Sequence, residues 1–133
     1  MVQPDGTLKV MDFGVARLRE RTQQLTSTGM VVGTPAYMAP EQLMDDPVDA
    51  RVDIYAAGVV MYECLTGHRP VDGGSPHVLM ARMLSSAIRP PHEVNPGVPK
   101  LLSAIVMRTL AKEADSRPST AGELYDLLAQ VEE

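Results

Sequence analysis

Residues 52–66 of this sequence are apolar on nearly every face of the helix that they would form, and Gly67 follows them. A glycine directly after a helix commonly supplies the left-handed residue that ends it. A helix that is apolar on all sides has to be buried, because none of its faces suits water. We therefore expect this helix to form the centre of a mainly helical domain.

The same stretch does not suit a membrane span. Its best candidate run, residues 54–64, is preceded by Asp53 and interrupted at Glu63, whereas a membrane helix needs about 18–20 apolar residues. Cys64 is the only cysteine, so no intrachain disulfide can form. Its place in the apolar helix favours a small core residue over a nucleophile. We expect the chain to be soluble and cytoplasmic, and the sequence leaves open whether a parent protein is membrane-anchored.

Further segments carry helix signals. Pro40 suits the first turn of a short helix over residues 40–44. Ser75 followed by Pro76 is an N-cap pair for a helix that ends near residue 86.

The last third of the chain continues this helical pattern. Residues 100–112 place apolar side chains on one helical stripe, made of Leu101, Leu102, Ile105, Val106 and Leu110. Thr120 and Glu123 form a capping box for a last helix. The side chains of that helix that we expect to face inward are Leu124, Leu127, Leu128 and Val131. The proline-rich residues 89–99 are expected to be loop.

The first part of the chain is different in character. Residues 4–6 read P-D-G, a turn signal, and residues 8–11 alternate loosely as a short strand, so the chain is expected to begin within a β-hairpin. Residues 15–38 show no sustained periodicity and read as a long loop. A loop of that length inside a compact domain is usually functional or mobile.

The charge balance argues against one class of function. The 133 residues fit one domain. They carry 17 Asp and Glu against 12 Lys and Arg, a net charge of −5 at pH 7. A broad basic face for binding nucleic acid is therefore not expected.

Four short motifs follow one another along the chain, in an order that is unlikely to arise by chance. They are D-F-G at residues 12–14, G-T-P-A-Y-M-A-P-E at 33–41, D-I-Y-A-A-G at 53–58, and R-P at 117–118. This set resembles the C-terminal half of a eukaryotic-like serine/threonine protein kinase, of the type also common in bacteria. The resemblance covers essentially the whole chain.

The resemblance implies an incomplete, mainly α fold, the C-lobe of a protein kinase with a short β-hairpin remnant at the N-terminus. Residues 1–14 would be the hairpin and the D-F-G motif. Residues 15–41 would be the activation segment, and residues 42–133 the helical C-lobe.

The resemblance assigns the D-F-G motif to the metal site. Asp12 would hold Mg²⁺ against the phosphates of ATP, because a hard dication takes hard oxygen ligands. Phe13 would pack its ring inward and set Asp12 in or out of the site. Gly14 would permit the backbone change that this requires.

In the activation segment, Thr34 matches the threonine that positions the substrate and favours Ser/Thr over Tyr. Thr26 and Thr28 lie where bacterial members often autophosphorylate, and Ser27 remains an alternative. A phosphate there adds about −1.5 to −2 charge and can order a loop by pairing with arginine. The arginines expected to do so are Arg17, Arg19 and Arg21; for Arg19 and Arg21 the alternative is a solvated surface charge.

Three further residues have structural roles by resemblance. Glu41 and Arg117 would form a buried ion pair that anchors the activation segment. Asp53 would accept hydrogen bonds from the catalytic loop; the alternative is an exposed acid that interacts with the helix dipole.

The sequence lacks the other parts that a kinase needs. It contains no G-x-G-x-x-G loop, no V-A-I-K strand and no H-R-D-x-x-x-x-N loop, so no catalytic aspartate is present. His68-Arg69-Pro70 is not that loop, since proline replaces the aspartate and the loop would have to precede D-F-G.

Two hypotheses follow. The first is an ATP- and Mg²⁺-dependent kinase of protein Ser/Thr residues, active when joined to the missing N-lobe and catalytic loop. The alternative is a catalytically dead, kinase-derived binding module or a non-functional fragment. Under the first hypothesis the chain alone binds no ATP.

The missing half also predicts a folding problem. Helix 52–66 would expose side chains such as Val59, Val60 or Tyr62, and Asp53 would be a buried acceptor without donors. We therefore expect the chain alone to be helical but loosely packed and prone to aggregation.

Overall fold

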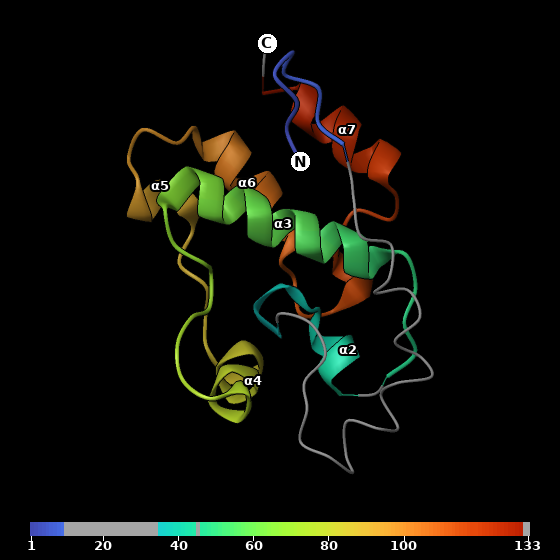
Figure 1. Ribbon diagram of the computed structural model, residues 1–133, viewed down its shortest axis with the longest axis vertical. Coiled ribbons are helices and arrows are strands. Elements are labelled where there is room, and N and C mark those ends of the chain that lie inside the picture. Colours follow the sequence, from blue (N-terminus) through green and yellow to red (C-terminus); the bar gives the residue numbers. More distant parts are fainter. Residues whose placement is uncertain (10–34, 45, 132–133) are drawn as a thin grey trace. The chain divides into compact units, whose positions relative to one another are not determined.

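The structure, a computed structural model, describes residues 1–9, 35–44 and 46–131. The chain divides into two compact units, Met1–Gly33 and Thr34–Glu133 (Figure 1). The first unit contributes a hairpin to the described residues, and the second contributes all of the helices.

The described part of the first unit, residues 1–9, is a tight β-hairpin. Val2 and Leu8 pair through an isolated antiparallel bridge. At the turn Gly6 adopts a φ of 84°, in the left-handed region that favours glycine. The predicted turn is therefore confirmed. The predicted strand 8–11 is described only up to its second residue.

The second unit consists of helices joined by loops. In chain order they are the 3-10 turn η2 (Pro35–Tyr37), α2 (Pro40–Leu43), α3 (Arg51–Thr66), α4 (Pro76–Ser85), α5 (Pro91–Val94), α6 (Lys100–Thr109), the 3-10 turn η3 (Ala114–Ser116) and α7 (Ala121–Ala129). Figure 1 shows α3 as the long central helix of this unit, and both α5 and α6 contact it. Among the described residues, no helix has the length and apolar character needed to cross a membrane.

Helix α3 lies at the centre of the core, as its apolar sequence predicts. Tyr55, Val59 and Tyr62 are buried in a cluster that also contains side chains of η2, α4 and α6. Ile54 is buried in a second cluster with side chains of α6 and α7. The helix ends where Gly67 takes the left-handed conformation, with a φ of 77°.

Helices α3 and α6 approach each other closely at Gly58. A Cβ atom built on Gly58 would lie 2.0 Å from Oγ1 and 2.9 Å from Cβ of Thr109. Thr109 is fully buried, and its hydroxyl donates to the carbonyl of Val106 at 2.6 Å. Turning that hydroxyl away would leave a buried polar group unpaired. Packing between the two helices therefore requires glycine at position 58.

Helices α4 and α7 begin at the caps that the sequence predicts. The Ser75 hydroxyl accepts a hydrogen bond from the N–H of Val78 at 3.4 Å, and the Thr120 hydroxyl accepts one from the N–H of Glu123 at 3.0 Å. In a capping box the Glu123 carboxylate would accept a hydrogen bond from the N–H of the N-cap residue Thr120, but here the donor is the residue before it. The Glu123 carboxylate accepts from the N–H of Ser119, at 2.7 Å.

Two expectations for the region after residue 88 are wrong, and one side chain of the predicted stripe is exposed. Residues 89–99 are not all loop, because Pro91 opens the short helix α5, where a residue without an N–H costs nothing. Helix α6 ends at Thr109 rather than at residue 112. Leu101 is 48% exposed, since helical spacing identifies a side of the helix and not how far a neighbour covers it.

One side of α3 is exposed. The exposed positions follow one another at spacings of four, three and four residues, which places them on a single helical face. We call this face the α3 stripe; it consists of Asp53, Ala57, Val60 and Cys64.

The α3 stripe corrects several expectations. Cys64, predicted to be a core residue, is exposed. Val59 and Tyr62, predicted to lose their cover, are buried, whereas Val60 is 50% exposed as predicted. In a helix that is apolar all round, the sequence does not tell which side meets its neighbours.

Candidate functional site

Part of the predicted site lies outside the described residues. This applies to the D-F-G motif and the activation segment up to residue 34, namely Asp12, Phe13, Gly14, Arg17, Arg19, Arg21, Thr26, Ser27, Thr28 and Thr34. Glu41, Asp53 and Arg117 are described, and all of them belong to the second unit.

The structure brings Glu41 and Arg117 together, although 76 residues separate them. The guanidinium meets the carboxylate along two parallel bonds, Nη1–Oε1 at 2.6 Å and Nη2–Oε2 at 2.8 Å. The side chain of Arg117 is 0% exposed and that of Glu41 is 12% exposed. A two-pronged pair of this kind fixes orientation as well as distance.

The remaining N–H groups of Arg117 bind backbone carbonyls. Nε donates to Ala111 at 2.8 Å, Nη2 to Lys112 at 3.0 Å and Nη1 to Arg51 at 3.3 Å. With the bonds to the carboxylate, these use every donor that an arginine has. The guanidinium also lies 4.9 Å from the centre of the Tyr55 ring. Arg117 therefore ties α2, the start of α3 and the 111–117 loop to one buried charge.

Pairing with Arg117 keeps the Glu41 carboxylate ionised although it is partly buried. Burial alone would raise the pKa of Glu41, but the hydrogen bonds from Arg117 outweigh it and hold the pKa below its usual value. Burial raises the pKa of the adjacent Tyr55 to about 12. Glu41 is thus an anion, and Tyr55 a neutral phenol, at physiological pH.

The local sequence explains why Glu41 faces the core. Pro40 occupies the first position of α2, where no N–H is needed. The N–H of Ala39, just before the helix, donates to Oε1 of Gln42 at 2.8 Å. The residues on either side of Tyr37 are buried, namely Ala36, Met38, Ala39 and Pro40. The segment that resembles the end of an activation segment is therefore part of the core of the second unit.

A second tie joins this segment to α3. The hydroxyl of Tyr37, in η2, donates to Oε2 of Glu63 at 2.6 Å. That hydrogen bond is the main reason why the pKa of Tyr37 is raised. The sequence analysis did not predict this pair. The available signal was Glu63, the one charged residue in the apolar run 54–64.

Asp53 lies apart from this buried pair. It is an exposed residue in the first turn of α3, and its carboxylate accepts no hydrogen bond from a described residue. The expectation of a buried acceptor without donors is therefore wrong for this chain. The alternative of an exposed first-turn acid matches what the structure shows.

A metal site is not assembled by the described part of the chain. No group of three or more His, Cys, Asp or Glu side chains there is arranged to hold a metal ion. The residue that the resemblance assigns to Mg²⁺, Asp12, lies outside that part.

Comparison with known proteins decides the family. The sequence model of the protein kinase domain matches residues 1–127. The chain belongs to the protein kinase family. The predicted fold class, a mainly α, kinase-like C-lobe, is confirmed by this match together with the helices of the second unit.

Similar kinases come from several bacteria. The chain is 39% identical over 129 residues to the DNA damage-responsive serine/threonine-protein kinase RqkA of Deinococcus radiodurans, with 97% of this chain and 19% of that kinase covered. It is 37% identical to the probable serine/threonine-protein kinase CA_C1728 of Clostridium acetobutylicum, covering 98% and 20%. It is 40% identical to the serine/threonine-protein kinase PknB of Mycobacterium leprae, covering 98% and 21%.

These relatives are serine/threonine kinases, as the resemblance predicts. The chain spans about a fifth of their length.

Proposed function

We propose that this chain is the C-terminal half of a catalytic domain that transfers the terminal phosphoryl group of ATP to Ser or Thr of a protein. The activity requires a segment that supplies the N-lobe and the catalytic loop. The observation that carries the proposal is the buried, two-pronged pair of Glu41 and Arg117 directly after the segment at residues 33–41. The domain would act in the cytoplasm, where ATP is available.

In this proposal the described residues position the substrate-binding segment. Glu41 holds its end through Arg117, and Tyr37 holds its middle through Glu63. Thr34 would orient the hydroxyl that accepts the phosphoryl group. Catalysis of phosphoryl transfer depends mainly on positioning and on electrostatic stabilisation, so a rigid anchor contributes to the rate.

The D-F-G motif would serve the nucleotide. Asp12 would bind Mg²⁺, which when bound neutralises charge on the phosphates of ATP. Phe13 and Gly14 would control the position of that carboxylate. Phosphorylation of Thr26 or Thr28 would order the activation segment by pairing with arginine.

The α3 stripe supports a larger domain. An exposed apolar surface on a central helix costs free energy in water. We propose that the segment with the catalytic loop covers Ala57 and Val60, and that Asp53 accepts hydrogen bonds from that loop. Asp53 would then be exposed only while this segment is missing.

The proposal is tested by joining the chain to the segment encoded upstream of it. The DNA before the codon of Met1 should encode an H-R-D-x-K-x-x-N loop in frame. The joined protein should transfer phosphate from ATP to a generic protein substrate, and Asp12→Asn should abolish the transfer. The chain alone should show neither transfer nor measurable ATP binding by calorimetry.

The opposite results favour the alternative. If no such loop is encoded upstream and the chain alone is a well-folded monomer, a catalytically dead binding module is the better description. Transfer by the chain alone above the level of the Asp12→Asn variant would contradict the proposed dependence on a missing half.

A further inference from the structure

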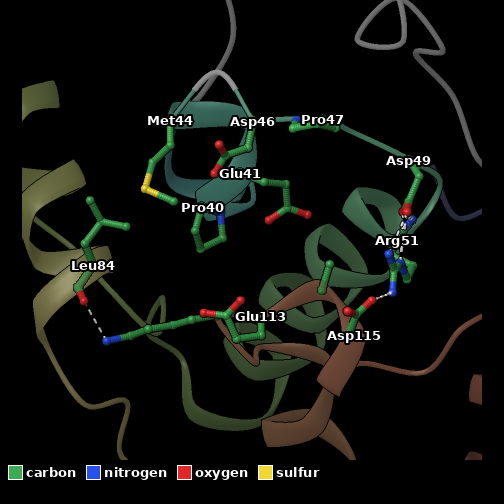
Figure 2. A pocket seen from close by; sticks show the side chains of 12 residues that line it. Pro40, Glu41, Met44, Asp46, Pro47, Asp49, Arg51, Leu84, Glu113 and Asp115 are labelled. Atoms are coloured by element: carbon green, nitrogen blue, oxygen red, sulfur yellow. Dashed lines mark hydrogen bonds and ion pairs between the residues drawn. The ribbon is translucent and has the colours of Figure 1, made fainter.

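A cavity that the proposed reaction does not use lies in the second unit. It has a volume of about 360 Å³ and opens between α2, the end of α4 and the 112–115 turn (Figure 2). Ligand pockets usually measure about 300–1,000 Å³, so the cavity has room for one or two amino-acid side chains. Glu41, Arg51 and Lys112 belong both to this lining and to the anchor described above, the last two through their backbone carbonyls.

Part of the cavity wall is apolar. Figure 2 shows in this lining Met44, which directly follows α2, and Leu84 of α4. Both side chains are exposed, at 50% and 40%. Pro40, Pro47 and Ala114 add further apolar surface. Such a wall can cover an apolar side chain or the aliphatic stem of a long basic one.

Most charges in the lining are already paired. Nη2 of Arg51 contacts Oδ2 of Asp49 at 2.8 Å, and its Nη1 contacts Oδ1 of Asp115 at 2.6 Å. The hydrogen bonds from Arg51 lower the pKa of Asp49. The Nζ of Lys112 donates to the Leu84 carbonyl at 2.8 Å, which holds this cation at the α4 side.

Among the described residues, two carboxylates of the lining, those of Asp46 and Glu113, have no such partner, and the ammonium of Lys112 contacts only a neutral carbonyl. Neither forms an ion pair or a side-chain hydrogen bond with a described residue, and both are exposed. They extend into the cavity lining from opposite sides, one following α2 and the other preceding η3 (Figure 2). Within the described residues, the cavity thus presents two carboxylates without an ion-pair partner, against the one ammonium of Lys112, beside an apolar wall.

We propose that this cavity docks an arginine side chain of a protein partner, together with an apolar residue beside it. The guanidinium would lie between Asp46 and Glu113, and the apolar residue would pack on Met44 and Leu84. Arginine fits better than lysine, because its planar head can donate to two carboxylates at once. The excess of carboxylates disfavours nucleic acid and anionic lipid, and the described residues form no cluster suited to a metal ion.

The proposal does not depend on kinase activity, so binding is measured directly. The probe is the peptide Ala-Leu-Arg-Ala-Leu-Ala-amide with fluorescein on its N-terminal amine. It is titrated with the whole chain, alone and joined to its upstream segment, while fluorescence anisotropy is recorded. We expect saturable binding that weakens as salt is added, since exposed charges are screened. The peptide with citrulline in place of arginine should bind at least about threefold more weakly.

Matched variants decide whether the cavity is responsible. Asp46→Asn with Glu113→Gln removes the charge of both carboxylates and should weaken binding about threefold or more. The control removes the same charge elsewhere, through Glu93→Gln with Asp126→Asn, both exposed and outside the cavity. Circular dichroism before each titration establishes that the variants are folded.

Several results would overturn the proposal. They are an absence of saturable binding, equal weakening by the control variant, or unchanged binding of the citrulline peptide. If sedimentation shows that the chain dimerises and that the cavity variant alone disrupts the dimer, a second copy is the occupant instead.

Discussion

The free energy of unfolding of the second unit depends strongly on a single residue, Arg117. Its charge is removed from water and compensated by one carboxylate and by backbone carbonyls of three residues. A buried charge pair is not stabilising in itself, because desolvation offsets much of the attraction. Breaking it is costly, however, because the remaining charge stays buried without a partner.

Replacement of only one partner leaves the other charge buried and unpaired. Each single replacement should therefore cost more than half of the stability that the double replacement costs. Arg117→Met and Glu41→Gln should each lower the free energy of unfolding, by about 3–5 kcal/mol for a fully broken buried pair. The double variant should lose less than the sum of the two. Urea denaturation of the four proteins measures this, and strict additivity would mean that the pair is not coupled.

The lowered pKa of Glu41 also makes stability depend on pH. A glutamate in an unfolded chain titrates near about 4.3, and Glu41 titrates below that in the folded chain. Its contribution to stability is therefore complete above the unfolded pKa and is lost as the pH falls through the lowered folded pKa. Wild type should lose stability faster than Glu41→Gln over this acidic range, as measured by urea denaturation at several pH values.

Tyr37 reports on the second tie. Its pKa is raised first by the hydrogen bond to Glu63, then by burial and by the negative charge of that residue. Glu63→Gln should lower the pKa of Tyr37 toward its usual value, as followed by NMR of labelled tyrosine. Tyr62 is the internal reference: burial raises its pKa, its hydroxyl donates to the Arg89 carbonyl rather than to Glu63, and its pKa should not change.

At the scale of elements, the contact between α3 and α6 sets a steric limit. Gly58→Ala would gain helix propensity of about 1 kcal/mol but would drive a methyl group into Thr109. Overpacking of this kind costs about 1–3 kcal/mol, so we expect net destabilisation or, at best, no gain. Thr109→Ala in the same chain should relieve part of the clash.

A glycine in another helix provides the control. A Cβ atom on Gly122, near the start of α7, would lie 3.6 Å from the nearest side-chain atom, which is ordinary contact. Gly122→Ala should therefore be neutral or stabilising. Thermal unfolding compares the two variants, and equal effects would contradict a steric role for position 58.

At the scale of the whole molecule, the α3 stripe distinguishes a half-domain from a complete one. Val60→Gln should change the stability of the chain alone by no more than about 0.5 kcal/mol, because the side chain is exposed. In the chain joined to its upstream segment, the same change should destabilise, because the amide would be buried. It should also reduce aggregation of the chain alone.

Val59→Ala is the matched control for that comparison. Val59 is fully buried in the described core, so its truncation should cost about 1–3 kcal/mol in both forms of the protein. If Val60→Gln behaves identically in the two forms, the stripe is not covered by the missing segment. The expectation of a loosely packed chain stays a prediction that the same unfolding curves test.

Local rules were enough to predict where α2, α4, α6 and α7 begin and where α3 ends. The cap at Ser75, the cap at Thr120 and the stop at Gly67 each depend on hydrogen bonds between residues a few positions apart. The order of the short motifs also sufficed to identify the kinase family. The caps and the stop can be read from a sequence because their partners are close together in the chain, whereas the family is recognised from the order of motifs along the whole chain.

Tertiary structure alone decided which side of α3 is buried and how much of the stripe on α6 is covered. It left Cys64 and Leu101 exposed and joined Tyr37 to Glu63. It also placed Asp46 and Glu113 around one cavity. The exposure of these side chains and the contacts between them depend on which elements pack beside α2 and α3, and on the length of those elements. Periodicity within one helix carries no information about the length or position of its neighbours.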